Sequence, residues 1–588
     1  MKRCPECRRD YYEDSLLYCL DDGNALLEGP ASGSGAGDEP ATAILSVPGA
    51  VATGDSASES PTRAQIHTTD QTAVFPRGTE AEPQKNLSDS SERHSLSAHR
   101  VAKPLAVLIV AVLILVGGFF GYRYVTQTKQ INSIAVMPFV NDSGNADVEY
   151  LSDGMTETLI NSLSQIPNLS VKARSSVFRY KGKEIDPKKI ASELGVQAIL
   201  TGHVMQRGDQ LTLSVELIDA QTENVIWGNK YDRKGSDLVS LQSEVARDVS
   251  GKLKSKISGA DAAKVEKSFT ANPEAYQLYL KGIFYWNKRT PESLKRSIEF
   301  FNQAIEKDPA YSLAYAGIAE AYVILPNFNV CTPQDCYPKA TAAAKRALEL
   351  DGSLAEAHTA LALALQNDFK FPEAEQEYKQ AIQMNPNYAT AHQWYGRMLV
   401  QTKRYDEAVA EGKRAQELDP LSLIITDNLS DDCFFQGKYD EALRYAKATV
   451  DMEPNSFLGY LAVASVYEIK GNYADALTEY KRVIELNDDP NYLTYLAHLY
   501  AVSGKRDEAL KTLDQMKQIA NGGRYISAYG YAAVYAGLGD KDKAIEQLER
   551  SYEDRHPDFL FVAVDPFFKD LHSDPRFIDL MHRAGLPE

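Results

Sequence analysis

The most regular pattern of hydrophobic and polar positions is a period of 34 residues in the C-terminal half of the chain. Apolar residues recur three and four positions apart in each unit, which predicts two amphipathic helices per unit. One small residue marks the second helix of each unit, and a small side chain is needed where the two helices of a hairpin cross closely. These positions are Ser297, Ala340, Ala374, Ala408, Ala442, Ala476, Ala509 and Ala544.

Residues that end helices recur with the same period of 34. Proline follows the second helix at Pro309, Pro386, Pro420 and Pro454, where it ends a helix. The turns inside several units begin with glycine, which adopts left-handed cap geometry at little cost. The unit EAHTALALALQNDFKFPEAEQEYKQAIQMNP closely resembles the tetratricopeptide-repeat (TPR) family. We therefore expect a mainly α chain with a helical solenoid of seven to eight TPR units over residues 274–556, and the resemblance implies protein or peptide partners.

The second unit departs from the repeat. Eleven extra residues lie between Gly317 and Ala340, and they include Cys331 and Cys336. In an oxidising compartment these two cysteines could form a disulfide that rigidifies the loop; the alternative is two free loop thiols. Beyond the repeats, residues 557–588 are expected to cap the exposed apolar end of the solenoid.

The concave surface of a TPR solenoid is lined by residues of the first helix of each unit. A large aromatic residue with an arginine nearby, as this frame provides, is a suitable anchor pair for a peptide. Thr359 and Leu363 replace the residues with which chaperone-binding TPR proteins hold a terminal carboxylate, so no peptide class is indicated. His358 and His392 are one repeat apart, and we expect packing between helices rather than a metal site. The predicted groove residues are Gln393, Trp394, Arg397, Asp427, Asn428, Asp431, Tyr495 and His498.

Residues 132–258 alternate between strand and helix patterns, which predicts an α/β domain. A strand is expected at Ser133–Phe139, and helices at Tyr150–Ile166, at Pro187–Gly195 and from Leu238 to Ile257. Three strands are expected between the helix at Pro187–Gly195 and the helix from Leu238 to Ile257. The segments IAVMPF, YLSDGMTETLINSL, ELGVQAILTGHV and LIDAQTENVIWGNKYD resemble the amino-terminal domain of the TolB translocation protein and its relatives. The resemblance implies a non-enzymatic, generally extracytoplasmic module with an assembly or sensing role.

One apolar run without charge extends from Pro104 to Tyr122. Its 19 residues span roughly 28 Å as a helix, which matches a bilayer, so we predict a transmembrane helix over 104–124. Before this run stand four basic residues, and two follow it, which favours a cytoplasmic N-terminus. The expected location is therefore the inner membrane, with a single pass and with the TolB-like and TPR regions outside the cytoplasm.

The N-terminal 28 residues contain three cysteines. Cys4 and Cys7 have C-x-x-C spacing, and Cys19 begins a second turn in which Asp22, or the adjacent Asp21, is the fourth ligand. Four protein ligands leave no open position, so the expected zinc ion is structural. The segment resembles short zinc ribbons at the N-termini of bacterial membrane proteins; free surface thiols are the alternative. Residues 29–99 are rich in small and polar residues and are expected to form a flexible, disordered linker.

Composition narrows the classes of function. The formal net charge is −18, so the chain lacks the basic surface that nucleic-acid binding needs. The sequence contains no kinase, zinc-protease or α/β-hydrolase motif, and we expect neither an enzyme nor a small-molecule substrate. Two hypotheses remain. The first is a membrane-anchored interaction scaffold with a sensory or assembly role. The second is a transmembrane signalling or regulatory protein whose zinc ribbon is the cytoplasmic output and contacts nucleic acid, although the ribbon is itself net negative.

Overall fold

The computed structural model describes residues 2–3, 10–11, 27–28, 131–184, 186–253 and 258–588. The predicted zinc ligands Cys4, Cys7, Cys19 and Asp22, the linker and the predicted transmembrane helix lie outside these residues. Among the described residues, no helix is both long and apolar enough to cross a bilayer. The described N-terminal residues form three short antiparallel strands in the order β2-β1-β3. Their bounds are β1 Lys2–Arg3, β2 Asp10–Tyr11 and β3 Leu27–Glu28.

The α/β domain is built on a mixed sheet within residues 133–234. The strand order is β6-β4-β7-β8-β9; β4 is parallel to both β6 and β7, while β7, β8 and β9 form an antiparallel meander. β5 pairs with the far end of β7. Gly208 takes a left-handed φ of 61° between β7 and β8, which permits the tight turn. The strands are β4 Ser133–Val136, β5 Val140–Asn141, β6 Ser170–Val171, β7 Ala198–Arg207, β8 Gln210–Asp219 and β9 Val225–Lys234.

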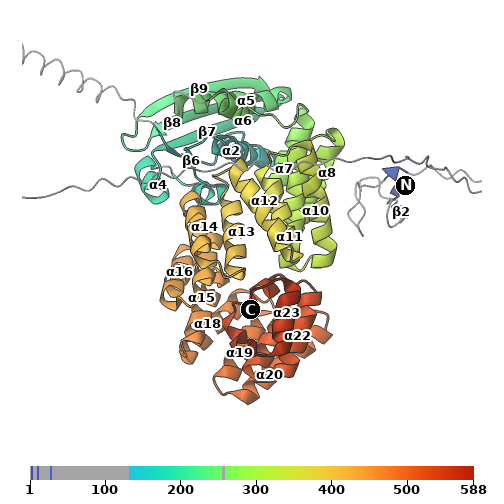
Figure 1. Ribbon diagram of the computed structural model, residues 1–588. Helices are drawn as coiled ribbons and strands as arrows, with labels where there is room; N and C mark the ends of the chain where they lie inside the picture. The colour runs from blue at the N-terminus through green and yellow to red at the C-terminus, as the bar shows by residue number, and fades with distance from the viewer. Residues whose placement is uncertain (1, 4–9, 12–26, 29–130, 185, 254–257) are drawn as a thin grey trace, which may run out of the picture. The chain divides into compact units, whose positions relative to one another are not determined.

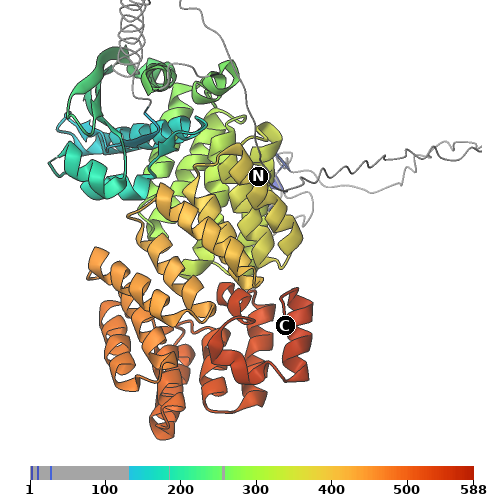
Figure 2. The same ribbon diagram turned by 60° about the vertical axis from the view of Figure 1, so that its left-hand side comes forward.

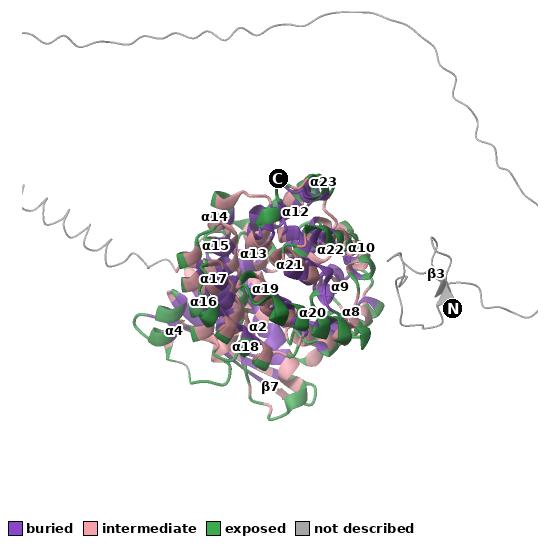
Figure 3. Ribbon diagram, turned by 90° about the horizontal axis from the view of Figure 1, so that it is seen from below, coloured by how far each residue is buried: buried purple, intermediate pink, exposed green. Residues whose placement is uncertain are grey.

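Helices pack against this sheet and connect it to the repeats. Leu151, Met155, Leu159 and Leu163 form the buried side of α2, as their spacing predicted. α2 lies between the sheet and α7 (Figure 1), whereas α4 lies at the outer edge of the domain with exposed residues on its surface (Figure 3). The helices are α2 Glu149–Ser164, α3 Arg174–Val177, α4 Pro187–Leu194, α5 Leu238–Leu253 and α6 Gly259–Val265.

Close contact between α2 and α7 depends on a glycine. A Cβ atom added at Gly154 would come within 2.9 Å of the Leu280 side chain, which is fully buried. The absence of a side chain at this position therefore lets the first repeat pack directly on the α/β domain.

The repeats form eight helical hairpins within residues 273–553, stacked in chain order (Figure 2). Each small residue of the 34-residue pattern is 0–1% exposed and lies in the second helix of its hairpin, which confirms the predicted packing. The pairs are α7 Pro273–Trp286 and α8 Pro291–Lys307; α9 Ser312–Ile324 and α10 Pro333–Leu350; α11 Ala355–Asn367 and α12 Phe371–Met384; α13 Ala389–Gln401 and α14 Tyr405–Leu418; α15 Leu423–Phe435 and α16 Tyr439–Met452; α17 Phe457–Ile469 and α18 Tyr473–Leu486; α19 Tyr492–Val502 and α20 Arg506–Asn521; α21 Ala528–Gly537 and α22 Lys541–Glu553.

The turn inside the hairpins uses left-handed geometry even where glycine is missing. Gly437 and Gly471 have φ values of 75° and 79° in their units. In the third and fourth repeats the equivalent residues are Phe369 and Lys403, with φ values of 61° and 59°. These two side chains accept a conformation that normally favours glycine, and both contact the C-terminal segment of the chain.

The C-terminal segment does more than cover the last repeat. It consists of the 3₁₀ helices η5 Pro557–Phe561 and η6 Pro566–Leu571 and of α23 Pro575–Ala584. Phe568 packs edge-to-face on Tyr529 of α21, at a ring distance of 5.1 Å. Phe559 reaches back to the third repeat, where its ring meets that of Phe369 edge-to-face at 5.8 Å. The segment thus joins distant repeats in addition to covering the end of the solenoid.

Candidate functional site

A cavity of about 690 Å³ lies between the α/β domain and the first helices of the first five repeats. Because α2 and α3 supply one wall and α7, α9, α11, α13 and α15 supply others, both folded parts of the chain are needed to form it. Hydrogen bonds that are buried or partly buried fix these parts together. Ser176 Oγ donates to Asp419 Oδ1 at 2.5 Å, Arg179 donates to the Met452 carbonyl at 2.7 Å, and Asn385 donates to Ser164 Oγ at 2.8 Å.

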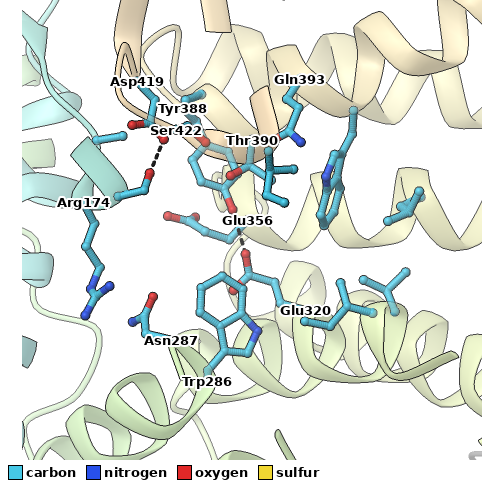
Figure 4. A pocket seen from close by; sticks show the side chains of 18 of the residues that line it. Arg174, Trp286, Asn287, Glu320, Glu356, Tyr388, Thr390, Gln393, Asp419 and Ser422 are labelled. Carbon is cyan, nitrogen blue, oxygen red and sulfur yellow. Dashed lines mark hydrogen bonds between the residues drawn. The ribbon is translucent and has the colours of Figure 1, made fainter. Parts of the chain in front are cut away.

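Three glutamates contribute carboxylates to this cavity (Figure 4). Glu157 lies 3.0 Å from Arg174 Nε and accepts a 2.7 Å hydrogen bond from the Asn287 amide. The Tyr388 hydroxyl donates to Glu320 at 2.7 Å, and Figure 4 shows Glu356 close to this pair. The three carboxylates therefore share one cavity, whose lining also carries the cations Arg174, Arg289 and Arg397.

The surroundings of these three carboxyl groups raise their pKa values. Burial raises the pKa of Glu320 to about 7, even though the hydrogen bond from Tyr388 acts in the opposite direction. Burial also raises the pKa of Glu356 and that of Glu157, the latter in spite of the nearby Arg174 charge. Near neutral pH, Glu320 can therefore gain or lose a proton in response to a bound charge.

Three polar atoms at this site have no hydrogen-bond partner within the described residues. One of them, Arg174 Nε, belongs to the ion pair with Glu157. The other two are the indole Nε1 of Trp286, a donor, and the amide Oδ1 of Asn367, an acceptor. The other amide atom of Asn367, Nδ2, is satisfied because it donates to the Leu363 carbonyl at 2.8 Å. Since buried polar groups are nearly always paired, these two atoms mark positions where a ligand or water is expected.

Four of the predicted groove residues, Gln393, Trp394, Arg397 and Asn428, line this cavity. Arg397 is already engaged, because it pairs with Asp432 at 3.0 Å and with Asp431 at 3.3 Å. Its guanidinium also lies 4.3 Å from the ring of Phe561.

Asp427 lies on α15, near Arg397 and its partners Asp431 and Asp432. It is buried, its Oδ1 has no hydrogen-bond partner in the described part of the chain, and burial together with the nearby Asp431 raises its pKa. Asp427 and Asp431 thus lie beside Arg397 but not among the residues that line the cavity.

Tyr495 and His498 line a separate cavity of about 300 Å³. His498 is buried; its Nδ1 lies 2.5 Å from Glu468, and its ring lies 4.1 Å from that of Phe567. Tyr495 contacts the same Phe567 ring at 6.5 Å. The predicted groove is therefore divided in two, and part of it is occupied by the C-terminal segment of the same chain.

Sequence reasoning missed the acidic wall of the site. Glu320 is the single charged residue of α9, within the otherwise apolar or small SLAYAGIAEAYVI, and that isolation was an available signal. Glu157 and Arg174 could not be assigned in this way, because they lie on α2 and α3 of another domain and reach the site only through tertiary packing.

The remaining candidate residues are structural. Cys331 and Cys336 are joined by a disulfide with their Cα atoms 6.2 Å apart, at the start of α10. His358 and His392 each contact a glutamate of the following helix at 2.5 Å, which agrees with the expected packing between helices. No group of three or more metal-ligating side chains occurs in the described ranges.

Two family models match parts of this chain. Residues 129–247 match the second domain of HilA/YgeH-like transcriptional regulators, which covers most of the α/β domain. Residues 359–422 and 429–490 match the tetratricopeptide repeat, in agreement with the predicted solenoid. The resemblance of the α/β domain to TolB remains a prediction.

A protein of Rhizobium meliloti (strain 1021) named "Putative adenylate cyclase 3" is 34% identical over 240 residues. That match covers 40% of this chain and 40% of the relative. A solved structure of pilF from Pseudomonas aeruginosa is 25% identical and covers 37% of this chain and 94% of its own, with a TM-score of 0.30. The TPR protein YrrB, described as having an unusual peptide-binding site, is 22% identical, with coverages of 32% and 93% and a TM-score of 0.24.

Proposed function

We propose that this chain is a membrane-anchored scaffold for protein–protein interaction, and that the cavity between the α/β domain and the first five repeats holds part of the partner. The observation that carries the proposal is the cavity itself, which combines Gln393, Trp394 and Asn428 with a wall supplied by another domain. TPR repeats are protein-interaction modules, which supports the proposal. An assembly or sensing role outside the cytoplasm remains part of this proposal.

A second candidate is a signalling or regulatory protein whose N-terminal zinc ribbon is the cytoplasmic output and contacts nucleic acid. The match of residues 129–247 to a domain of transcriptional regulators favours it. So do the hydrogen bonds that fix the α/β domain to the repeats, because a ligand bound between two parts can alter how both are held. The two candidates share the binding step and differ in its consequence, which is assembly in the first case and a signal to the cytoplasm in the second.

Several components of the proposal rest on the sequence. These are structural zinc at the N-terminal ribbon, a transmembrane helix at 104–124, a cytoplasmic N-terminus in the inner membrane, and a binding rather than an enzymatic activity. Fusions of alkaline phosphatase and of a fluorescent protein to the C-terminus test the orientation. Bright cytoplasmic fluorescence without phosphatase activity would overturn it. A cyclase assay on the purified full chain tests the absence of enzymatic activity, and measurable turnover of ATP would contradict it.

The interaction itself is tested by affinity capture with the full chain in mild detergent. Trp394→Ala is expected to abolish recovery of the partner, because it removes an aromatic wall of the cavity. Trp227→Ala is the matched control, since it removes an indole from β9 that does not line the cavity. Equal capture by native chain and Trp394→Ala would refute the assignment. Arg397→Ala is less informative, because it leaves Asp431 and Asp432 without their cation.

A further inference from the structure

The cavity contains carboxylates that are not neutralised by direct ion pairs. Glu320 and Glu356 make no ion pair within the described residues, whereas Glu157 is paired with Arg174. Arg289 also belongs to the lining, but its guanidinium stacks on the Trp286 ring at 3.7 Å and it forms no ion pair in the described ranges. Two acidic groups thus face the cavity without a contacting cation, and their ionised forms are costly unless a positive charge enters.

Aromatic rings form other parts of the same wall. Trp286, Tyr388 and Trp394 all line the cavity, and Figure 4 shows Trp286 and Tyr388 on either side of the Glu320 side chain. Aromatic faces attract ammonium and guanidinium groups, and the attraction is stronger where water is excluded. Inorganic cations are a poorer fit, because no cluster of metal-ligating side chains is present in the part of the chain that the structure describes.

The unpaired polar atoms give independent evidence for a ligand. Asn367 is only 4% exposed, and its free Oδ1 requires an N–H donor. Trp286 Nε1 requires an acceptor, such as a carbonyl oxygen. A ligand with a cationic N–H group and a nearby carbonyl would satisfy both atoms together with the carboxylates, and a lysine or arginine residue of a peptide has both.

We propose that this cavity recognises an organic ammonium or guanidinium group, supplied by a basic residue of the protein partner or by a free amine. The inference rests on the proposed scaffold function and deepens it by naming the chemistry that the partner must present. Glu320 and Glu356 bind the cation. Trp286 and Trp394 form an aromatic wall beside it. The Asn367 Oδ1 accepts a hydrogen bond from one of its N–H groups.

The test is a titration of the full chain in detergent with N-acetyl-L-arginine amide, followed by calorimetry and by tryptophan fluorescence, because two of the three tryptophans line the cavity. N-acetyl-L-citrulline amide has nearly the same shape without the charge. We expect it to bind at least about tenfold more weakly. Equal binding of the two compounds, or no binding of either, would overturn the proposal without any variant.

Variants locate the cation. The double variant Glu320→Gln, Glu356→Gln is expected to lose at least about tenfold in affinity. The control Glu299→Gln, Glu373→Gln removes the same charge from exposed positions of α8 and α12 and should leave affinity unchanged. Thermal unfolding of all three proteins identifies any variant that has lost its fold, in which case the citrulline comparison decides. Equal weakening by both double variants would point to bulk charge and refute the site.

A third compound distinguishes the sources. Butylguanidinium has the cation but not the carbonyl, so weaker binding than N-acetyl-L-arginine amide assigns the site to a residue of a peptide, while equal binding assigns it to a free amine. The scaffold proposal and the cation site can be refuted independently of each other. If a partner is captured and its capture is insensitive to N-acetyl-L-arginine amide and to the glutamate variants, the scaffold proposal stands and the cation site is refuted. If the small cation binds but no partner is captured, the cation site stands and the scaffold proposal is refuted.

Discussion

The substitution Glu320→Gln tests whether the half-buried carboxylate lowers the stability of the protein at neutral pH. Glutamine retains the shape and an acceptor for the Tyr388 hydroxyl, but it does not ionise. The charges around Glu320 are Glu356 and Glu157, which raise its pKa, and Arg289, which lowers it. Burial dominates, and the pKa in the folded chain is about 7 against an ordinary value of 4.5.

The sign and size of the effect follow from proton linkage. Well below pH 4.5 the group is protonated in both the folded and the unfolded chain, so it contributes no difference in stability. As the pH rises to about 7 the unfolded chain ionises first, and the free energy of unfolding falls. At about 1.4 kcal/mol per pH unit, the loss approaches about 3 kcal/mol above pH 7. Glu320→Gln should remove this loss, so it stabilises the chain at pH 8 and not at pH 4.

The assay is urea unfolding of the full chain in detergent, followed by tryptophan fluorescence at pH 4, 6 and 8. Glu299→Gln, an exposed site on α8, is the control and should match the native chain at each pH. Equal stability of Glu320→Gln and native chain at pH 8 would show that Glu320 is solvated or neutralised, and that the reasoning about its environment is wrong. Adding N-acetyl-L-arginine amide should stabilise the native chain at pH 8, because the bound cation favours ionised Glu320.

Three further predictions concern other parts of the chain. Gly154→Ala should lower the free energy of unfolding by about 1–3 kcal/mol, because its Cβ would press on Leu280, while Gly251→Ala on α5 has open space and should not destabilise. His358 is half-buried, and this desolvation lowers its pKa, but its hydrogen bonds, above all to Glu377, outweigh that effect and raise the pKa above 6.5. The stabilising effect of His358 should be complete at lower pH and be lost as the pH rises through the folded value, a difference that unfolding of His358→Gln can measure. Chelation should release about one zinc per chain, measured by a colorimetric dye, if the predicted ribbon binds the metal. The melting of the repeats should then stay unchanged, because the predicted ligands Cys4, Cys7, Cys19 and Asp22 all lie outside the repeats. Absence of zinc would favour the alternative of free thiols.

Local structure was predictable because it depends on neighbours in the sequence. The alanine period places a small residue at every hairpin crossing, and each of these residues is buried as expected. The helix at Tyr150–Ile166 could likewise be predicted from its apolar spacing and corresponds to α2. These features follow from the 3.6-residue geometry of a helix and need no knowledge of distant contacts.

The candidate site was only partly predictable, because its parts meet through tertiary packing. The repeat frame identified Gln393, Trp394 and Asn428, which share the cavity. It could not show that Phe561 and Phe567 occupy the concave surface, since both lie outside the repeats and far along the chain from the side chains of α13 and α15 that they touch. Periodicity predicts which face a residue occupies but not which distant segment covers that face.

The contacts between the C-terminal end of the chain and the third and fourth repeats change how unfolding can proceed. In an open array each repeat is stabilised only by its neighbours, so an end can fray while the middle stays folded. Here Arg555 pairs with Asp368, Phe559 packs on Phe369, and Lys403 donates to a carbonyl of Glu588. Loss of the last repeat therefore also removes contacts from repeats near the middle of the chain. These contacts couple the two regions, so the array should melt more cooperatively than a linear stack and resist extension along its axis.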